Sequence, residues 1–292
     1  MRQLTLADAV AGAELLGALQ SDIGYRPTVT PAEVREWMQW GDLADDSWAF
    51  EEDGRLTAFG WAFKHGELAE GGGFVHPDAR GRGLGTELVE RSEGWARRKG
   101  FERLHVNAYG GDDAGHALLR GRGYRDVRRF YEMIGELDGT PQASKPPDGI
   151  RIAPFELSDA RAFHDTIADA FRDEWGFAPM GFEEWKRRRV DEADTSLYFL
   201  AWDGEEPAGA IRCEAPSSTD GFVGALGVRE AWRRRGLGEA LLLHAFVEMQ
   251  RRGLAVVRLG VDSENPSGAT RLYERAGMSV ATESVVYERT LT

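Results

Sequence analysis

Two glycine-rich segments carry the residue types best suited to holding a phosphorylated ligand. Residues 80–85 read Arg-Gly-Arg-Gly-Leu-Gly, and residues 233–238 read Arg-Arg-Arg-Gly-Leu-Gly. Glycine lets the backbone approach a ligand closely, and the free amides at a helix start attract an anion. Arginine adds charge-assisted hydrogen bonds to phosphate. The alternative is a tight turn beside a solvated basic patch, but two occurrences in the same context favour phosphate binding.

Two other phosphate-binding motifs fit these segments poorly. A P-loop requires Gly-Lys followed by Ser or Thr, and neither segment has it. A dinucleotide fingerprint requires a third small residue, and Leu88 and Leu241 stand at that place.

The two segments belong to a long internal repeat. The stretch 75–85 returns as 228–238, and Gly100 matches Gly253 at the same offset. A repeat of this length is a whole domain. We therefore expect an N-terminal domain over 1–138 and a C-terminal domain over 150–292. The proline-rich residues 139–149 between them lack large apolar side chains and are typical of a linker.

Periodicity indicates which elements position the turns. Short apolar or alternating runs predict strands at 197–202, 207–214, 221–228, 256–261 and 284–291. Helical spacing follows Gly238 as far as Gly253, and a short helix is expected over 267–276. Each copy is therefore predicted to be α/β (α+β), with a mixed, mostly antiparallel sheet flanked by helices and one parallel crossover.

The sequence resembles the Gcn5-related N-acetyltransferase (GNAT) family. Arg-x-x-Gly-x-Gly after a strand is similar to the acetyl-CoA pyrophosphate loop of that family. The second half of the signature resembles Asn265, the pair Leu272-Tyr273, and Gly277. The resemblance implies two tandem acyl-CoA N-acyltransferase domains, with acetyl-CoA as the cofactor.

The resemblance also implies which residues contact acetyl-CoA, and each follows from a match to the motif. In the C-terminal copy they are Leu226, Gly227, Val228, Arg233, Arg234, Arg235, Gly236, Leu237, Gly238, Glu239 and Asn265. The N-terminal equivalents are Gly73, Phe74, Val75, Arg80, Gly81, Arg82, Gly83, Leu84, Gly85 and Thr86.

Tyr273 is the implied proton donor, placed beside the sulfur of the cofactor. A coenzyme A thiolate leaves poorly unless a proton or hydrogen bond meets it. The alternative is that Tyr273 is a core aromatic of a short helix. With Gly123 aligned to Gly277, Leu119 stands at the equivalent position of the N-terminal copy. Leucine cannot donate a proton, so the C-terminal copy is expected to be active and the N-terminal copy catalytically degenerate.

The general base is less well defined. Glu214 and Asp220 are candidates, and a water chain to backbone carbonyls could serve instead. Each of the two acids is equally well explained as a solvated residue at a strand end. A further acidic and aromatic segment suits an amine through cation–π and charge contacts, although ordinary helix packing explains it equally well. It comprises Asp173, Glu174, Trp175, Phe177, Phe182, Glu183, Glu184 and Trp185.

Composition excludes several classes of function. The formal net charge is −13, which disfavours nucleic acid or an anionic membrane as partner and suits a cationic small molecule. The single cysteine, Cys213, allows no intrachain disulfide, and the histidines show no metal-ligand spacing. No apolar run approaches the roughly 18 residues that span a bilayer, and the first thirty residues show no secretory signal. A cytoplasmic location is expected, and the oligomeric state stays undetermined.

We therefore expect an N-acetyltransferase that acts on a primary amine of a small molecule. Acetylation of protein N-termini or lysines, and a non-catalytic acyl-CoA-binding role, are the alternatives. The tandem layout resembles mycothiol synthase-like two-domain acetyltransferases, which acetylate the cysteinyl amine of an aminosugar conjugate. Phe222 stands where those enzymes carry a glutamate, which favours a related tandem acetyltransferase.

Overall fold

The chain forms two compact units in a computed structural model that describes residues 1–137, 145–265 and 267–291. The first unit contains residues 1–131 together with 281–292, and the second contains 132–280. Among the described residues, no helix is both long and apolar enough to cross a membrane. Most of the predicted linker, 139–149, lies outside the described residues.

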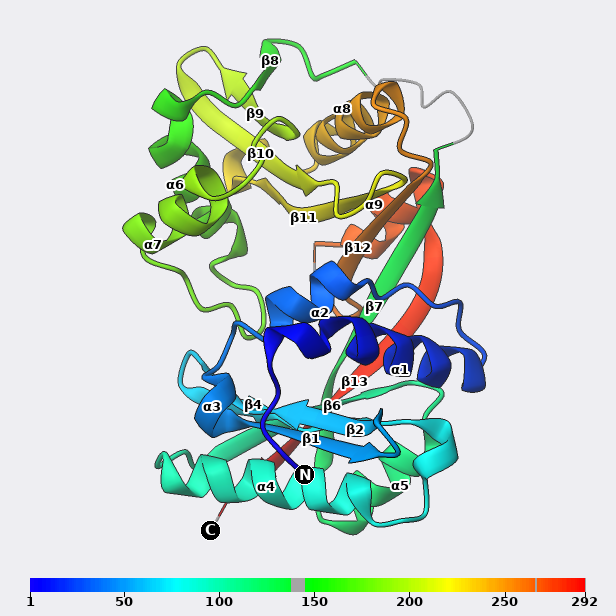
Figure 1. The fold of residues 1–292 in the computed structure, drawn as a ribbon. Coiled ribbons are helices and arrows are strands. Elements are labelled where there is room, and N and C mark those ends of the chain that lie inside the picture. Colours follow the sequence, from blue (N-terminus) through cyan, green and yellow to red (C-terminus); the bar gives the residue numbers. More distant parts are fainter. Residues whose placement is uncertain (138–144, 266, 292) are drawn as a thin grey trace. The chain divides into compact units, whose positions relative to one another are not determined.

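In the first unit, helices cover both faces of a small sheet. Strand β2 pairs with β1 on one side and with β5 on the other, and in the larger sheet β3 pairs with β4, which pairs with β6. Figure 1 shows α1 and α4 on opposite faces of the β1–β2 pair. The strands are β1 (Ser47–Glu52), β2 (Arg55–Trp61), β3 (Phe63–His65), β4 (Leu68–Gly71), β5 (Gly73–Val75) and β6 (Arg103–Tyr109). The helices are η1 (Leu6–Asp8), α1 (Ala9–Asp22), α2 (Pro31–Trp37), α3 (Leu43–Asp46), η2 (Pro77–Ala79), α4 (Leu84–Arg98) and α5 (Asp113–Gly121).

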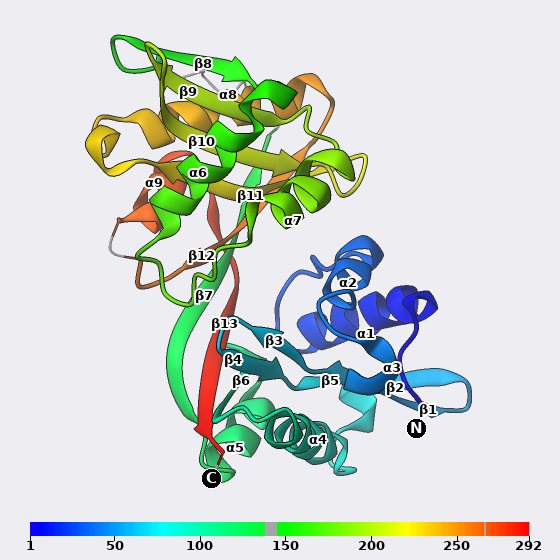
Figure 2. The same cartoon turned by 90° about the vertical axis from the view of Figure 1, so that its left-hand side faces the viewer.

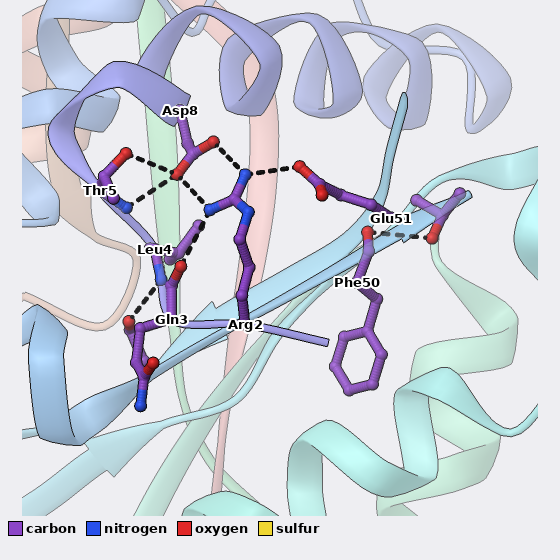
Figure 3. Close-up of polar contacts among 9 residues, drawn as sticks. Arg2, Gln3, Leu4, Thr5, Asp8, Phe50 and Glu51 are labelled. Atoms are coloured by element: carbon purple, nitrogen blue, oxygen red, sulfur yellow. Dashed lines mark hydrogen bonds and ion pairs between the residues drawn. The ribbon is translucent and has the colours of Figure 1, made fainter. Parts of the chain in front are cut away.

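An ion-pair cluster fixes the start of the first unit. The Arg2 guanidinium donates to both Asp8 carboxylate oxygens, at 2.8 and 2.6 Å, and to Glu51 Oε1 at 2.5 Å (Figure 3). The hydrogen bonds from Arg2 to Asp8 lower the pKa of the Asp8 carboxyl. Arg2 thereby ties the residues just before α1 to β1, and α1 in turn packs against β2 and β5.

The second unit repeats this arrangement. Helices α6 and α8 lie on opposite faces of β9, β10 and β11 (Figures 1 and 2). The strands are β8 (Ile150–Pro154), β9 (Tyr198–Asp203), β10 (Glu206–Glu214), β11 (Asp220–Val228) and β12 (Val256–Asp262). The helices are η3 (Leu157–Asp159), α6 (Ala160–Phe171), α7 (Phe182–Lys186), the π-helical η4 (Arg187–Asp191), η5 (Glu230–Trp232), α8 (Leu237–Arg251) and α9 (Ala269–Arg275).

The parallel crossover predicted for each copy is present in both units. Strand β11 pairs with β12 in parallel, with α8 between them in the chain. Strand β4 pairs with β6 in parallel, with α4 between them. The pairings β1–β2, β9–β10 and β10–β11 are antiparallel. The predicted α/β class and the mostly antiparallel sheets are confirmed.

The units differ from the predicted boundaries because the last strand of each half passes into the other unit. Strand β7 (Arg125–Glu136) starts in the first unit, and its end lies beside β12 in the second. Strand β13 (Ser279–Thr290) starts in the second unit and pairs antiparallel with β6 over Ser284–Thr290. The end of the chain is therefore part of the first unit.

The side chains of β13 complete the core of the first unit. Val285 and Tyr287 are buried with Trp95 and Leu104. Tyr287 is fully buried, and its hydroxyl shares a 2.9 Å hydrogen bond with His116 Nδ1 on α5.

We expect Tyr287→Ala to destabilise the first unit, although residue 287 lies in the C-terminal half of the sequence. Truncating a large buried aromatic costs about 3–5 kcal/mol of unfolding free energy. Hydrogen exchange should show lost amide protection in β6, with β12 little affected. Val280→Ala, at a residue 46% exposed, serves as the control. Lost protection confined to β12 would contradict the strand exchange.

Candidate active site

In the second unit, a gap opens between β11 and β12. The two strands pair only over Asp220–Val223. The register between β10 and β11 shifts here, so that Gly224 is an extra residue, and β11 continues to Val228. A bulge of this kind disrupts the ladder and redirects the strand. Leu226, Gly227 and Val228 lie past the break, where the backbone side toward β12 can receive a ligand.

The glycine-rich turn leads from this strand into α8. Gly236 precedes the helix with φ at 81°, and a Cβ there would meet nothing within 4 Å. The Ala240 amide donates the first hydrogen bond of the helix, to the Gly236 carbonyl. The amides of Leu237, Gly238 and Glu239 come before it, so they have no acceptor within the helix. The turn therefore presents an open, amide-lined surface at the positive end of a helix.

Arg234 holds this turn in a strained conformation. Its φ is 59°, which is left-handed backbone, and the equivalent residue of the first unit is Gly81 with φ 73°. A non-glycine residue in this region costs roughly 1–2 kcal/mol. Strain of this kind gathers at functional sites. The turn of the second unit therefore carries backbone strain that glycine avoids in the first.

The two turns differ in how their arginines are neutralised. In the first unit, Arg80 pairs with Asp22 and lies 3.9 Å from Asp112, and Arg82 pairs with Glu52 at 2.5 Å.

In the second unit, Arg233 donates to the carbonyls of Val228 and Ala170, at 3.0 and 2.9 Å. Arg234 and Arg235 are exposed, and no carboxylate pairs with them in the part of the chain that the structure describes. The second turn therefore keeps its positive charge available, whereas carboxylates offset that of the first.

The first unit nevertheless has a formed cavity of about 400 Å³ at its glycine-rich turn. Its lining includes most of the residues predicted there: Gly73, Phe74, Val75, Arg80, Gly81, Gly83, Leu84, Gly85 and Thr86. Gly72, with φ 115°, separates β4 from β5, so the strand breaks here as β11 does. Arg82 lies outside the lining that the structure gives for this cavity.

Packing establishes which residue of the first unit corresponds to Tyr273. A Cβ on Gly85 would meet Leu118 at 3.2 Å, and a Cβ on Gly238 would meet Leu272 at 3.1 Å. The next residues, Leu119 and Tyr273, therefore occupy equivalent helix positions. Both are buried, at 3% and 8% exposure, and Leu119 lines the cavity of the first unit.

The surroundings of Tyr273 keep its phenol protonated. Burial, followed by the negative charge of Glu174 and by Cys213, raises the pKa of Tyr273 to about 12. At neutral pH the side chain is thus a proton or hydrogen-bond donor. Burial also raises the pKa of the Cys213 thiol. Cys213 is therefore a thiol and not a nucleophilic thiolate.

Asn265 lies beside the same carboxylate. Its Nδ2 donates to both oxygens of Glu174, at 3.0 and 2.9 Å, while its Oδ1 accepts from the Ser267 amide at 2.8 Å. Glu174 was expected only as one of several acidic residues in the acidic and aromatic segment. Its position just after the first helix of the copy was the available signal, but sequence cannot show which acid of that segment points inward.

The remaining residues of that acidic and aromatic segment divide between core and surface. Trp185 stacks on Phe163, with centroids 5.8 Å apart, and Phe182 stacks on Trp185 at 6.2 Å. Glu184 pairs with Arg188 at 2.8 Å. For these residues the structure agrees with ordinary helix packing.

The two predicted bases lie in different settings. Glu214 is opposite Phe222 across the β10–β11 pair and forms ion pairs with Arg212 and, at 3.7 Å, with Arg189. Asp220 begins β11 and accepts a 2.8 Å hydrogen bond from Ser217. At about 3.3 Å per residue, it lies about 13 Å along the strand from Gly224.

Comparison with known proteins identifies relatives over the whole chain. The family model described as "Acetyltransferase (GNAT) family" matches residues 16–124 and 160–278. A protein named mycothiol acetyltransferase from Geodermatophilus obscurus is 31% identical, over 98% of this chain and 96% of its own. One of the same name from Catenulispora acidiphila is 31% identical, over 83% and 82%.

Solved structures show the same fold. A GCN5-related N-acetyltransferase from Sphaerobacter thermophilus has a TM-score of 0.86 and 32% identity, covering 99% of this chain and 95% of its own. A tandem GNAT protein from the clavulanic acid biosynthesis pathway has a TM-score of 0.75 and 17% identity, covering 100% and 98%.

Proposed function

We propose a function on the premise that this chain belongs to the acetyltransferase (GNAT) family: its second unit transfers an acetyl group from acetyl-CoA to a primary amine of a small molecule. Family membership makes the chain an acyltransferase with two tandem GNAT domains. One observation carries the assignment to the second unit. At equivalent helix positions, that unit has the protonated phenol of Tyr273 and the first has Leu119.

The residues of the second unit fit acetyl-CoA. The open turn at Gly236, the amides that begin α8 and the exposed Arg234 and Arg235 suit a pyrophosphate. The strand past Gly224 offers backbone groups to an extended pantetheine arm. Acetyl-CoA supplies an activated acetyl thioester when bound.

The chain's own groups then have separate tasks. Leu226, Gly227 and Val228 orient the bound arm through backbone hydrogen bonds. An amide of this strand would stabilise the negative charge that develops on the acetyl oxygen. Tyr273 would hold the proton that the thiolate leaving group needs.

Two lines of support favour a small-molecule acceptor over a protein. The relatives that match most of the chain are named for acetylation of mycothiol, a small molecule. The net charge of −13 suits a cationic amine, which the acidic residues near the site would attract. If both units only bound acyl-CoA without catalysis, the protonated phenol of Tyr273 would have no catalytic function.

The test is a panel of amines assayed with the full chain and acetyl-CoA, followed as thiol release. The panel contains the cysteinyl amine of an aminosugar conjugate, simple aminosugars, polyamines and lysine-containing peptides. We expect a small-molecule amine to be acetylated with the highest kcat/KM. Activity confined to peptides would replace this acceptor class, and the absence of amine-dependent thiol release with every acceptor would overturn the function.

A further inference from the structure

One arginine side chain contacts the backbone at the point where β11 leaves β12. Arg212 on β10 lies opposite Ala225, and its Nη2 donates to the Gly224 carbonyl at 3.1 Å. Gly224 is the extra residue of the bulge and follows Val223, where the pairing of β11 with β12 ends. A bulge leaves its extra residue without a regular partner in the ladder. Arg212 therefore supplies a donor to this carbonyl at the start of the gap.

The guanidinium of Arg212 also lies directly against the backbone of Gly224. A Cβ added to this glycine would lie 2.6 Å from Arg212 Nη2, 2.7 Å from Cζ and 2.8 Å from Nη1. These separations are far below the roughly 3.5–4.0 Å of an ordinary van der Waals contact. The close approach of the guanidinium to the bulge therefore requires glycine at position 224.

Glu214 holds the guanidinium of Arg212 in place. Its carboxylate forms an ion pair with Arg212 Nη1, and Nη1 of Arg189 on η4 lies 3.7 Å from the same carboxylate oxygen. A guanidinium is planar and carries several donors, so one side chain can bind a carboxylate and a carbonyl at once. The Arg212 side chain is 13% exposed, which limits competition from water for these bonds. Glu214 thus has a task other than that of a base, because it orients Arg212.

The first unit has an aromatic residue at the position equivalent to Arg212. The amides just after β5 and β11 donate to the carbonyls of Thr57 and Ala208, at 2.9 and 3.0 Å, which makes these two residues equivalent. Four residues further along the two strands are Trp61 and Arg212. Trp61 stacks on Phe59, with ring centroids 5.9 Å apart. At this position, the charged side chain belongs to the unit proposed to be catalytic.

We propose that Arg212 is a positioning residue for acetyl transfer and acts by fixing the Gly224 carbonyl. The inference rests on the proposed function and adds the side chain that sets the direction of β11 at the gap. A carbonyl and the amide after it share one plane, so a bond to the Gly224 carbonyl fixes the plane from which the backbone continues to Leu226. The amide proposed to stabilise the acetyl oxygen belongs to this stretch. Its direction matters because such donors act only when aimed at the developing charge.

The first test is Arg212→Met, which removes the charged bond and keeps an unbranched side chain. For the best amine of the panel, we expect kcat to fall roughly 10- to 100-fold, because a misplacement of about 1 Å near the reaction can cost about 100-fold. The acetyl-CoA Kd should stay within about twofold, since the open turn at Gly236 is unchanged and the lost effect belongs to the transition state. Arg212→Lys keeps a charge but not the fixed fork, so its kcat should fall between the two.

Gly224→Ala tests the same contact from the backbone side. Its Cβ should displace the guanidinium from the carbonyl, because the end of a flexible side chain moves more readily than a strand. Both changes remove one contact, so the double variant with Arg212→Met should lose little more kcat than Arg212→Met alone, whereas independent effects would multiply. Arg187→Met is the matched control, because it breaks an exposed arginine–carboxylate pair of the same unit, 2.9 Å from Glu192.

Kinetics and calorimetric titration of acetyl-CoA use the same samples, so that a loss of folded protein is not mistaken for a loss of turnover. Three results would overturn the inference. They are turnover of Arg212→Met within about twofold of the parent, a loss of acetyl-CoA affinity as large as the loss of kcat, or losses that multiply in the double variant. Failure of the proposed function is a separate result, since the parent chain itself would then show no amine-dependent thiol release.

Discussion

Tyr273→Phe should lower kcat by roughly 10²–10⁴-fold and leave the acetyl-CoA Kd within about twofold. The phenol is buried and its pKa is raised to about 12, so the proton is present at neutral pH and is needed only when the sulfur leaves. An interaction made only in the transition state affects kcat and not binding. Phenylalanine fills the same space, so packing should be little changed.

The check is steady-state kinetics with the best amine, together with calorimetric titration of acetyl-CoA. Tyr198→Phe is the matched control, because Tyr198 is also a buried tyrosine of the second unit with a raised pKa. Turnover of Tyr273→Phe within about twofold of the parent would remove the proton-donor role.

Gly236→Val should abolish acetyl-CoA binding by the second unit. Valine at a φ of 81° is strained, and its side chain would occupy the open surface in front of the first amides of α8. Both effects remove the shape and the amide direction that a pyrophosphate needs. We expect the affinity of this site to fall below what calorimetry detects.

Gly253→Val provides a closely matched control at the other end of the same helix. Gly253 has φ 82°, and a Cβ there also meets nothing within 4 Å. The strain is therefore comparable, but the residue lies away from the turn. Equal loss of binding in both variants would show that helix stability, and not the turn, accounts for the effect.

The sequence was sufficient to predict the repeated elements and the residues of the two turns. The constant offset between the copies aligns Gly83 with Gly236, and each precedes a helix in the structure. It also aligns Gly85 with Gly238, which pack in the same way against Leu118 and Leu272. Short apolar runs located β9 and β12, in which consecutive residues are buried, and the other strands followed from a mixture of apolar and alternating residues.

The exchange of the last strands could not be predicted from periodicity. Strands β7 and β13 end equivalent copies, and an alternating strand fits the edge of either sheet. Which edge it joins depends on long-range contacts, such as Tyr287 with His116, that link residues far apart in the chain. Each compact unit therefore includes a strand segment from the other half of the sequence.

The partners of the arginine side chains at the two turns also could not be predicted from the sequence motif. Arg80 and Arg233 occupy the same position, yet the first pairs with Asp22 and the second donates to backbone carbonyls. Asp22 comes from the end of α1, so its proximity depends on how that helix packs. The same holds for Glu174, whose contact with Asn265 joins two distant segments.

The most direct test of the account compares amine-dependent thiol release by two double variants of the full chain. One changes Gly83 and Gly85 to Val, and the other changes Gly236 and Gly238 to Val. Because Leu119 replaces the proton donor in the first unit, acetyl transfer should survive the first change at least in part and disappear with the second. Activity lost only in the first variant would show that the wrong half has been assigned as the catalyst.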